Sequence, residues 1–257
     1  MNVDEHLSHL DDAGKRLGAA AEAAGLDAQV PSCPEWVVRD LVRHQGGVHR
    51  WAAGHIAPPR TEHWDADLDV VVGSWPGDND LLGWFAAGHA SLIEVLSNAD
   101  PDLVCWTFLA APSPLAMWAR RQAHETTVHR VDAELAAGWR PAKVPAAFAA
   151  DGVDELLTCF ITRTPAGMLR ADPGKALLVR CTDDLGEWLV SIGPERVTTS
   201  TGDDAKTAAA TADCEVSGSA NDLYLALWHR GPVSGLSIKG DAGVLDFFNE
   251  QVQVTWS

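Results

Sequence analysis

The chain has 257 residues, of which 46% are hydrophobic and 21% are charged, values that are ordinary for a globular protein. Its formal charge of −17 disfavours nucleic acid and anionic membrane surfaces as partners, because both attract lysine and arginine. The five scattered cysteines form no C-x-x-C pair, no apolar run is long enough for a membrane span, and the acidic first residues do not resemble a signal peptide. We therefore expect a cytoplasmic protein with reduced thiols.

The N-terminal part predicts four long helices in an antiparallel bundle. Apolar residues recur at helical spacing over residues 3–24, and Gly25 is a natural stop. A second helix is expected to begin at Ser32, because Ser32-Cys33-Pro34-Glu35 has the pattern of a capping box with a proline in the first turn. Its apolar stripe includes His44. After irregular stretches that begin at His55 and Asp100, two further helices are expected over residues 80–98 and 118–137.

The pattern changes after Pro141, where the C-terminal part begins. One more helix is predicted over residues 146–162, and from Ala176 the apolar period drops to two, which is typical of strands. Further elements are expected as strands over 176–181, 187–193, 196–201, ADCEVSGS and LSIKG, and as helices over 221–229 and AGVLDFFNEQ. This order predicts an α+β fold with a mostly antiparallel sheet, in two domains over residues 1–143 and 144–257.

A candidate metal site lies in the fourth helix. Glu125 and His129 stand four residues apart in a stretch without glycine or proline, so one helix face carries a carboxylate and an imidazole one turn apart. His44, from the inward stripe of the second helix, is the candidate third ligand. A Glu–His pair of this spacing is also compatible with simple pairing on an exposed helix face. Its neighbours here are large or apolar, so we expect the face to be buried, and a buried carboxylate needs a cationic partner.

Three protein ligands leave a coordination position open for water or substrate, which is typical of catalytic metal sites. The segment HETTVH is not the H-E-x-x-H motif of zinc proteases, because position 128 is valine. Two adjacent stripes are expected on this helix: Met117, Arg121, His124, Val128, Val131 and Leu135 on one, and Trp118, Gln122, Glu125, His129, Asp132 and Ala136 on the other. Among the other histidines, His6, His9, His55 and His63 are expected at the surface or in loops, and His89 as a hydrogen-bonded core residue.

The segments SCPEWVVRDLVRHQGGVHRWA and MWARRQAHETTVHRVDAE closely resemble the mycothiol-dependent maleylpyruvate isomerase family of actinobacteria, and the resemblance covers nearly the whole chain. It implies a DinB-like N-terminal bundle and a small C-terminal α+β domain similar to sterol-carrier proteins. It also implies a divalent metal, typically zinc, on the residues that match His44, Glu125 and His129, with mycothiol as the thiol cofactor. The resemblance further implies a catalytic arginine from the C-terminal domain, for which Arg230 is the candidate, and Asp132 is expected to support a ligand.

The resemblance implies an enzyme in which the metal activates mycothiol as a nucleophile toward a small electrophilic substrate. An isomerase would add the thiolate to an activated cis C=C bond, allow rotation and release the thiolate, whereas an S-transferase would leave it attached. Two alternatives are a zinc-dependent hydrolase that activates water and a non-catalytic protein that holds a small apolar ligand. Basic residues are scarce, which argues against the anionic diacid maleylpyruvate as the substrate. Imidazole and carboxylate ligands suit several divalent metals.

Overall fold

The structure is a computed structural model that describes residues 1–163, 169–183 and 185–254. The chain divides into two compact units, Met1–Ala142 and Lys143–Ser257, which are described separately. The expected fold class is confirmed: a helical first unit precedes a unit with helices around a mostly antiparallel sheet. The domain ranges 1–143 and 144–257, with the roles assigned to them, stay a prediction. Within the described residues, no helix combines the length and the apolar character needed to cross a membrane.

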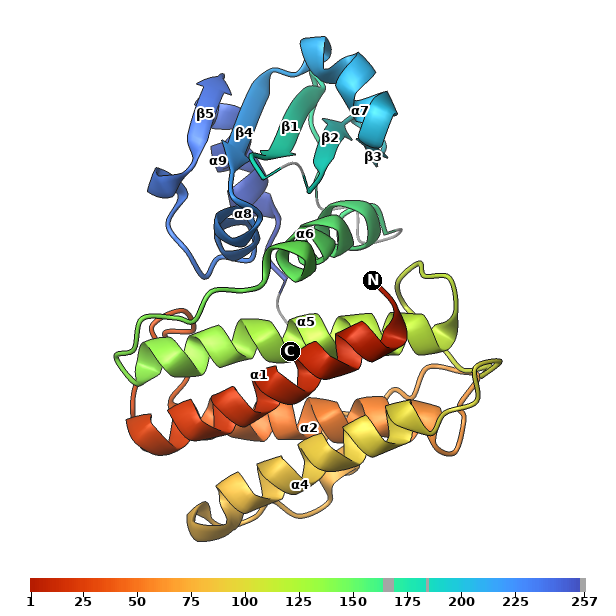
Figure 1. The fold of residues 1–257 in the computed structure, drawn as a ribbon, viewed down its shortest axis with the longest axis vertical. Coiled ribbons are helices and arrows are strands. Elements are labelled where there is room, and N and C mark those ends of the chain that lie inside the picture. The colour runs from red at the N-terminus through yellow and green to blue at the C-terminus, as the bar shows by residue number, and fades with distance from the viewer. Residues whose placement is uncertain (164–168, 184, 255–257) are drawn as a thin grey trace. The chain divides into compact units, whose positions relative to one another are not determined.

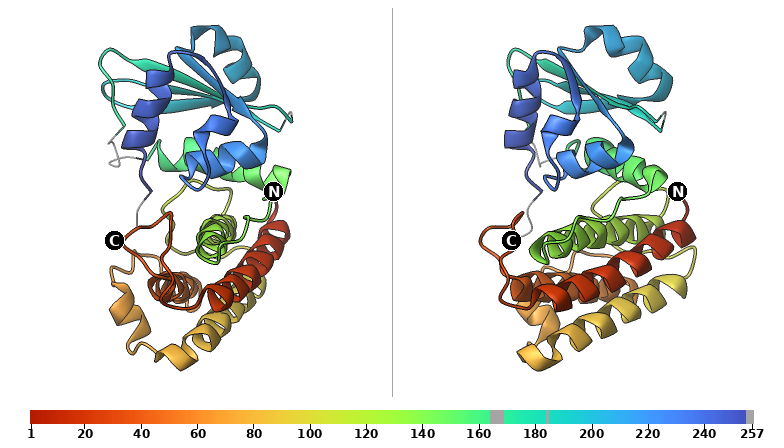
Figure 2. Two further views of the ribbon diagram at one scale, coloured as in Figure 1. Left: turned by 90° about the vertical axis from the view of Figure 1, so that its left-hand side faces the viewer. Right: turned by 60° about the vertical axis from the view of Figure 1, so that its left-hand side comes forward.

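Four long helices build the described part of the first unit (Figure 1). They are α1 (Val3–Ala24), α2 (Val38–Ile56), α4 (Asp78–Ser97) and α5 (Pro114–Ala136), with the short α3 (Leu68–Val72) between α2 and α4. In Figures 1 and 2, α1 runs beside α5, and α2 runs beside α4. The hydroxyl of Ser113 caps α5 by accepting from the backbone N–H of Ala116, and Pro114 fits the first turn. Almost every side chain of α5 is buried, so this helix is the centre of the unit.

The start of the second helix was predicted wrongly. The helix begins at Val38 rather than at Ser32. The hydroxyl of Ser32 does not cap a helix, because it donates a hydrogen bond to the carboxylate of Asp132 on α5. The actual cap is provided by Asp40, whose side chain accepts from the backbone N–H of Val37 at 3.0 Å. A long-range contact has therefore replaced the local one that the capping-box pattern predicted.

A five-stranded sheet in the order β3-β2-β1-β4-β5 forms the described centre of the second unit. Its strands are β1 (Lys175–Cys181), β2 (Glu187–Ile192), β3 (Val197–Thr201), β4 (Cys214–Gly218) and β5 (Ser237–Gly240). All neighbours pair antiparallel except β1 and β4, which are parallel. The helices of this unit are α6 (Ala146–Asp154), α7 (Gly202–Ala208), α8 (Ala220–Leu227) and α9 (Ala242–Gln251). The predicted helix over 146–162 is α6 followed by the π-helical turn Glu155–Phe160.

Helices cover both faces of this sheet (Figure 2). Leu178 and Leu189 face each other across β1 and β2, and both pack against Ala205 of α7. The helix α9 contacts β1 and β4 on the other side of the sheet. The sequence did not predict α7. With apolar side chains buried on both faces, the strands read as short continuous hydrophobic runs.

Candidate metal centre

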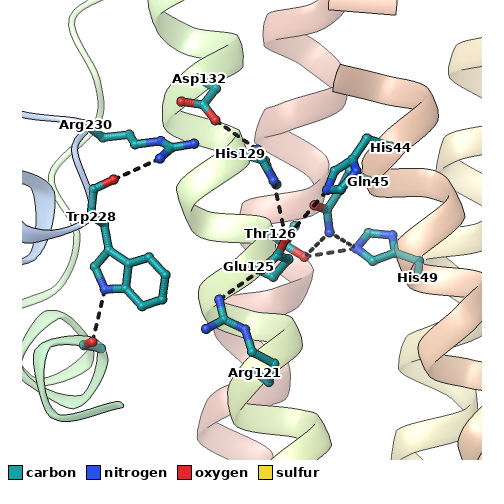
Figure 3. Close-up of polar contacts among 11 residues, drawn as sticks. His44, Gln45, His49, Arg121, Glu125, Thr126, His129, Asp132, Trp228 and Arg230 are labelled. Carbon is teal, nitrogen blue, oxygen red and sulfur yellow. Dashed lines mark hydrogen bonds and ion pairs between the residues drawn. The ribbon is translucent and has the colours of Figure 1, made fainter. Parts of the chain in front are cut away.

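The candidate ligands come from two helices of the first unit and meet at one point. Glu125 and His129 lie one turn apart on α5, and His44 faces them from α2 (Figure 3). One ligand atom from each of the three lies within 4.8 Å of the others. Their side chains are only 11% exposed for His44 and 8% for each of the other two. The structure therefore brings together all three residues singled out from the sequence, and it confirms that this face of α5 is buried.

The facing atoms have the character of metal ligands. Oε1 of Glu125 lies 3.4 Å from Nε2 of His129 and 3.7 Å from Nε2 of His44. Among the residues that the structure describes, the buried Nε2 of His44 has no hydrogen-bond partner. An unpartnered buried nitrogen costs free energy unless something else binds it. Two imidazoles and one carboxylate, with one nitrogen left unpartnered, fit a divalent cation such as zinc.

A hydrogen-bonded chain stands behind His129. Its Nδ1 lies 2.9 Å from Oδ2 of Asp132, which is fully buried one turn further along α5. A carboxylate oxygen accepts, so Nδ1 carries an imidazole proton, and Nε2 is the nitrogen that faces Glu125. The other oxygen of Asp132 accepts from the hydroxyl of Ser32. This is the supporting position expected for Asp132, and carboxylate–histidine pairs of this kind orient metal ligands in many proteins.

Arg121 also belongs to the site, although the sequence analysis placed it on the adjacent stripe of the helix. Its Nη2 lies 3.1 Å from Oε2 of Glu125, and its side chain is 2% exposed. Arg121, Glu125 and His129 follow one another at spacings of four residues, so they form a single row along α5. That spacing was visible in the sequence and was the signal that could have identified Arg121.

The electrostatics of the site favour the metal-binding protonation state at two of the three candidate ligands, His44 and Glu125. Burial lowers the pKa of the His44 imidazole. For Glu125, burial alone would raise the pKa, but the contacts with His129 and His44 outweigh it. The charge of Arg121 adds to this, so the pKa of Glu125 lies well below its usual value. Burial would lower the pKa of His129, but Asp132 and Glu125 outweigh it and raise that pKa. Neutral His44 and ionised Glu125 are the forms that bind metals.

A second hydrogen-bonded group sets the register of α2 against α5 next to the ligands. Gln45 follows His44 in the chain, and Thr126 follows Glu125. Nε2 of Gln45 donates to Oγ1 of Thr126 at 3.1 Å and to Nε2 of His49 at 2.8 Å. The same Nε2 of His49 lies 2.9 Å from Oγ1 of Thr126. All three residues are completely buried. Because the bond from Gln45 to Thr126 joins the residues that follow His44 and Glu125, the group holds His44 opposite Glu125.

Trp36 forms an aromatic wall beside the site and was not identified from the sequence. Its indole lies 4.9 Å from the ring of His44 and 6.1 Å from that of His129, measured between ring centroids. The tryptophan lies in the segment that precedes α2 and is partly exposed. No sequence signal distinguished it from the other tryptophans, because its position depends on how this segment folds back over the helices.

Two of the remaining histidines differ from the expectation. His55 and His6 are buried, whereas surface or loop positions were predicted for them. The reason for His55 is that α2 extends to Ile56, so its last turn carries the histidine into a cluster of aromatic rings. The prediction for His89 is correct in that its Nε2 donates to the carbonyl of Leu10 at 3.0 Å inside the core.

Arg230, the predicted catalytic arginine, lies in the second unit just after α8. Its backbone N–H donates to the carbonyl of Leu225 at 2.7 Å, and its Nη1 donates to the carbonyl of Trp228 at 2.9 Å. Figure 3 includes the contact with Trp228. These bonds define the local conformation of Arg230 within its own unit. The catalytic role of Arg230 stays a prediction.

The fold and the side chains define a two-unit α+β protein with a buried His–Glu–His cluster in a helical bundle. The family model of the mycothiol maleylpyruvate isomerase N-terminal domain matches residues 7–134, and the model of the C-terminal domain of that family matches residues 147–247. The chain belongs to the mycothiol-dependent maleylpyruvate isomerase family, which is a family of enzymes.

Similar structures agree with this assignment. A crystal structure of the mycothiol-dependent maleylpyruvate isomerase has a TM-score of 0.62 and 13% sequence identity, and the match covers 93% of each chain. A histidine-to-alanine variant of that isomerase matches with the same TM-score and coverage at 12% identity. At such identities the likeness shows a common fold. Comparison with curated proteins gave no match.

Proposed function

We propose that the chain is a mycothiol-dependent isomerase whose divalent metal, zinc or a similar ion, is held by His44, Glu125 and His129. The observation that carries this proposal is the convergence of one carboxylate and two imidazoles, from two helices, within 4.8 Å. Membership of the family supports the dependence on mycothiol. The proposed partners are therefore a small-molecule substrate and a low-molecular-weight thiol, in the cytoplasmic location expected from the sequence.

The chain's own residues prepare the site for thiol chemistry. A divalent metal bound there would supply a Lewis acid that lowers the pKa of a thiol, making it a nucleophile at neutral pH. His44 and His129 present Nε2, and Glu125 presents Oε1, to a common point. Asp132 retains the imidazole proton of His129 on Nδ1. Because these groups are almost fully buried, little water competes with them.

The proposed reaction is a cis–trans isomerisation of a small substrate with an activated C=C bond, after which the thiol is regenerated. Trp36 offers an apolar surface beside the ligand atoms, suited to an unsaturated carbon chain. Arg230 is the proposed catalytic residue of the second unit. Replacing it by methionine is expected to reduce turnover and to leave the metal content unchanged, because Arg230 is not among the proposed ligands.

The first test is elemental analysis of tag-free protein. About one zinc ion per chain is expected in the wild type. The ion should be lost in the double variant Glu125→Ala/His129→Ala and retained in the control variant His63→Ala, which removes an exposed histidine. An equal metal content in the wild type and the double variant would contradict the proposed ligands. No metal in any of them, even after zinc is added, would favour a non-catalytic binding protein.

The second test separates the reaction types. The purified, zinc-loaded protein is incubated with an electrophilic cis-alkene, with and without mycothiol, and the products are identified by mass spectrometry. An isomer of unchanged mass that forms only with the thiol is the expected result. A product that retains the thiol would identify an S-transferase instead. Cleavage of a substrate bond by water without any thiol would identify a hydrolase.

A further inference from the structure

We propose that Arg121 is a positioning residue that restricts Glu125 to binding the metal through one oxygen. This inference rests on the proposed metal site and concerns how its carboxylate is used. A carboxylate ligand can bind a cation through one oxygen or through both, and the choice sets how many positions remain for other ligands. In this chain the two oxygens of Glu125 have different partners.

The two oxygens are already distinguished in the structure. Oε1 of Glu125 faces the two imidazoles, at 3.4 Å from His129 and 3.7 Å from His44. Oε2 instead lies 3.1 Å from Nη2 of Arg121. This contact is an ion pair between a guanidinium nitrogen and a carboxylate oxygen, and at this depth little water weakens it. Oε2 of Glu125, which would have to bind a cation together with Oε1 for bidentate coordination, is therefore paired with the guanidinium of Arg121.

Burial and helix geometry keep this arrangement in place. The side chains of Arg121 and Glu125 are 2% and 8% exposed, so water screens their interaction weakly. Leaving either charge unpaired at this depth would be costly. Both residues project from the same face of α5, one turn apart, so the contact does not depend on how α5 meets another helix.

The consequences concern geometry and charge. With Glu125 limited to one oxygen, the three protein residues occupy three coordination positions, and a further position is open to the thiol. The positive charge of Arg121 also offsets the negative charge of Glu125, so the bound cation would keep more of its own charge. Both effects favour the binding of an anionic thiolate.

The spectrum of a Co²⁺-substituted protein tests the inference without reference to activity. The visible absorption of Co²⁺ weakens as its coordination number rises, so it reports directly on the mode of the carboxylate. In Arg121→Met, Oε2 is released, and we expect weaker visible absorption than in the wild type. In Arg121→Lys a single cationic donor is retained, and the absorption is expected to return toward that of the wild type.

A matched control is available on the same helix. Arg130 and Glu134 form another buried pair at a spacing of four residues, with Nη1 and Oε1 at 3.4 Å. The variant Arg130→Met removes a buried charge from α5 in the same way, yet its Co²⁺ spectrum is expected to match that of the wild type. Circular dichroism of all variants verifies that each is folded before the spectra are compared.

Three results would count against the inference, and they are distinguishable. A wild-type spectrum in Arg121→Met with Co²⁺ bound would overturn the role of Arg121 and leave the metal site standing. If Arg121→Met does not fold, a crystal structure of the zinc-loaded wild type replaces it, and both oxygens of Glu125 on the metal would overturn the inference. Failure of the wild type to bind Co²⁺ or zinc would overturn the proposed metal site and the inference with it.

Discussion

Nδ1 of His129 lies 2.9 Å from Oδ2 of Asp132, and this contact determines which nitrogen of the imidazole faces Glu125. Asp132 is completely buried and is itself held by the hydroxyl of Ser32, which lies in the segment before α2. The two contacts join α5 to the segment before α2 at one carboxylate. It also means that His129 is oriented before any ligand binds, which reduces the entropy lost on binding.

Replacing Asp132 by asparagine is expected to weaken zinc binding about 10- to 100-fold, the usual effect of losing a carboxylate behind a ligating histidine. The stoichiometry at saturating zinc should not change, because His44, Glu125 and His129 remain. Competition with a chelating dye measures the affinity. As a control, Asp12→Asn removes an exposed carboxylate paired with Arg16 and should bind zinc as the wild type does. Unchanged affinity in Asp132→Asn would show that the orientation of His129 is set by other contacts.

Metal loading is expected to stabilise the first unit against unfolding. A ligand present at 100 times its Kd stabilises the folded state by about 2.7 kcal/mol, provided that it does not bind the unfolded chain. Differential scanning calorimetry with zinc and with a chelator measures this shift. In Glu125→Gln, which lacks the charged ligand, the zinc-dependent rise in Tm should largely disappear. A rise as large in the variant as in the wild type would mean that zinc binds elsewhere.

Thr126→Val is expected to lower the free energy of unfolding by about 1 to 3 kcal/mol, because it removes a hydroxyl that contacts Gln45 and His49 inside the core. Valine has nearly the same shape, so the change reports on hydrogen bonding rather than on packing. Urea unfolding measures the effect. The matched control is Thr207→Val, whose hydroxyl bonds to the backbone of α7 at an exposed position and should cost about 0.5 kcal/mol or less. An equal loss of unfolding free energy in Thr126→Val and Thr207→Val would contradict a stabilising role for the buried hydrogen bonds of Thr126.

His55 is expected to make the protein less stable at acid pH. Burial, with smaller contributions from His63 and Arg60, lowers the pKa of His55 from 6.5 to about 4. Its ring lies 5.1 Å from those of Trp106 and Trp118, measured between centroids. Above pH 6.5 neither the folded nor the unfolded state carries a proton on this imidazole. As the pH falls from 6.5 toward 4, the unfolded state gains the proton first, so stability is lost across that interval.

The variant His55→Phe isolates this effect, because phenylalanine keeps an aromatic ring in the cluster and cannot be protonated. Urea midpoints at about pH 7.5 and pH 5 should differ less in the variant than in the wild type. The other buried histidines are unchanged in both proteins, so their contribution cancels in the comparison. An identical dependence on pH in the two proteins would show that His55 is already protonated in the folded state at pH 5.

Much of the site was predictable because it depends on helical periodicity. Glu125 and His129 share a face of α5 in any straight helix, and the inward stripe of α2 carries His44 toward the bundle interior. Helical periodicity also places Arg121 in one row with Glu125 and His129. Arg121 was missed because the sequence analysis assigned it to one stripe of the helix and the two ligands to the neighbouring stripe. The other strands and helices of the second unit were likewise predicted from changes in the spacing of apolar residues. The helix α7 was not predicted, because it buries one residue and so has no apolar stripe.

The sequence by itself determined the elements that carry the ligands, because helical and strand periods are local properties of the chain. Only the tertiary structure decided what those side chains contact. It placed Ser32 on Asp132 instead of on a helix end, brought Trp36 against His44, and paired β1 with β4 in parallel. The contacts of Ser32 with Asp132 and of β1 with β4 join residues far apart in the chain. They form because packing buries polar groups that must then find partners, and no local pattern specifies which partner lies within reach.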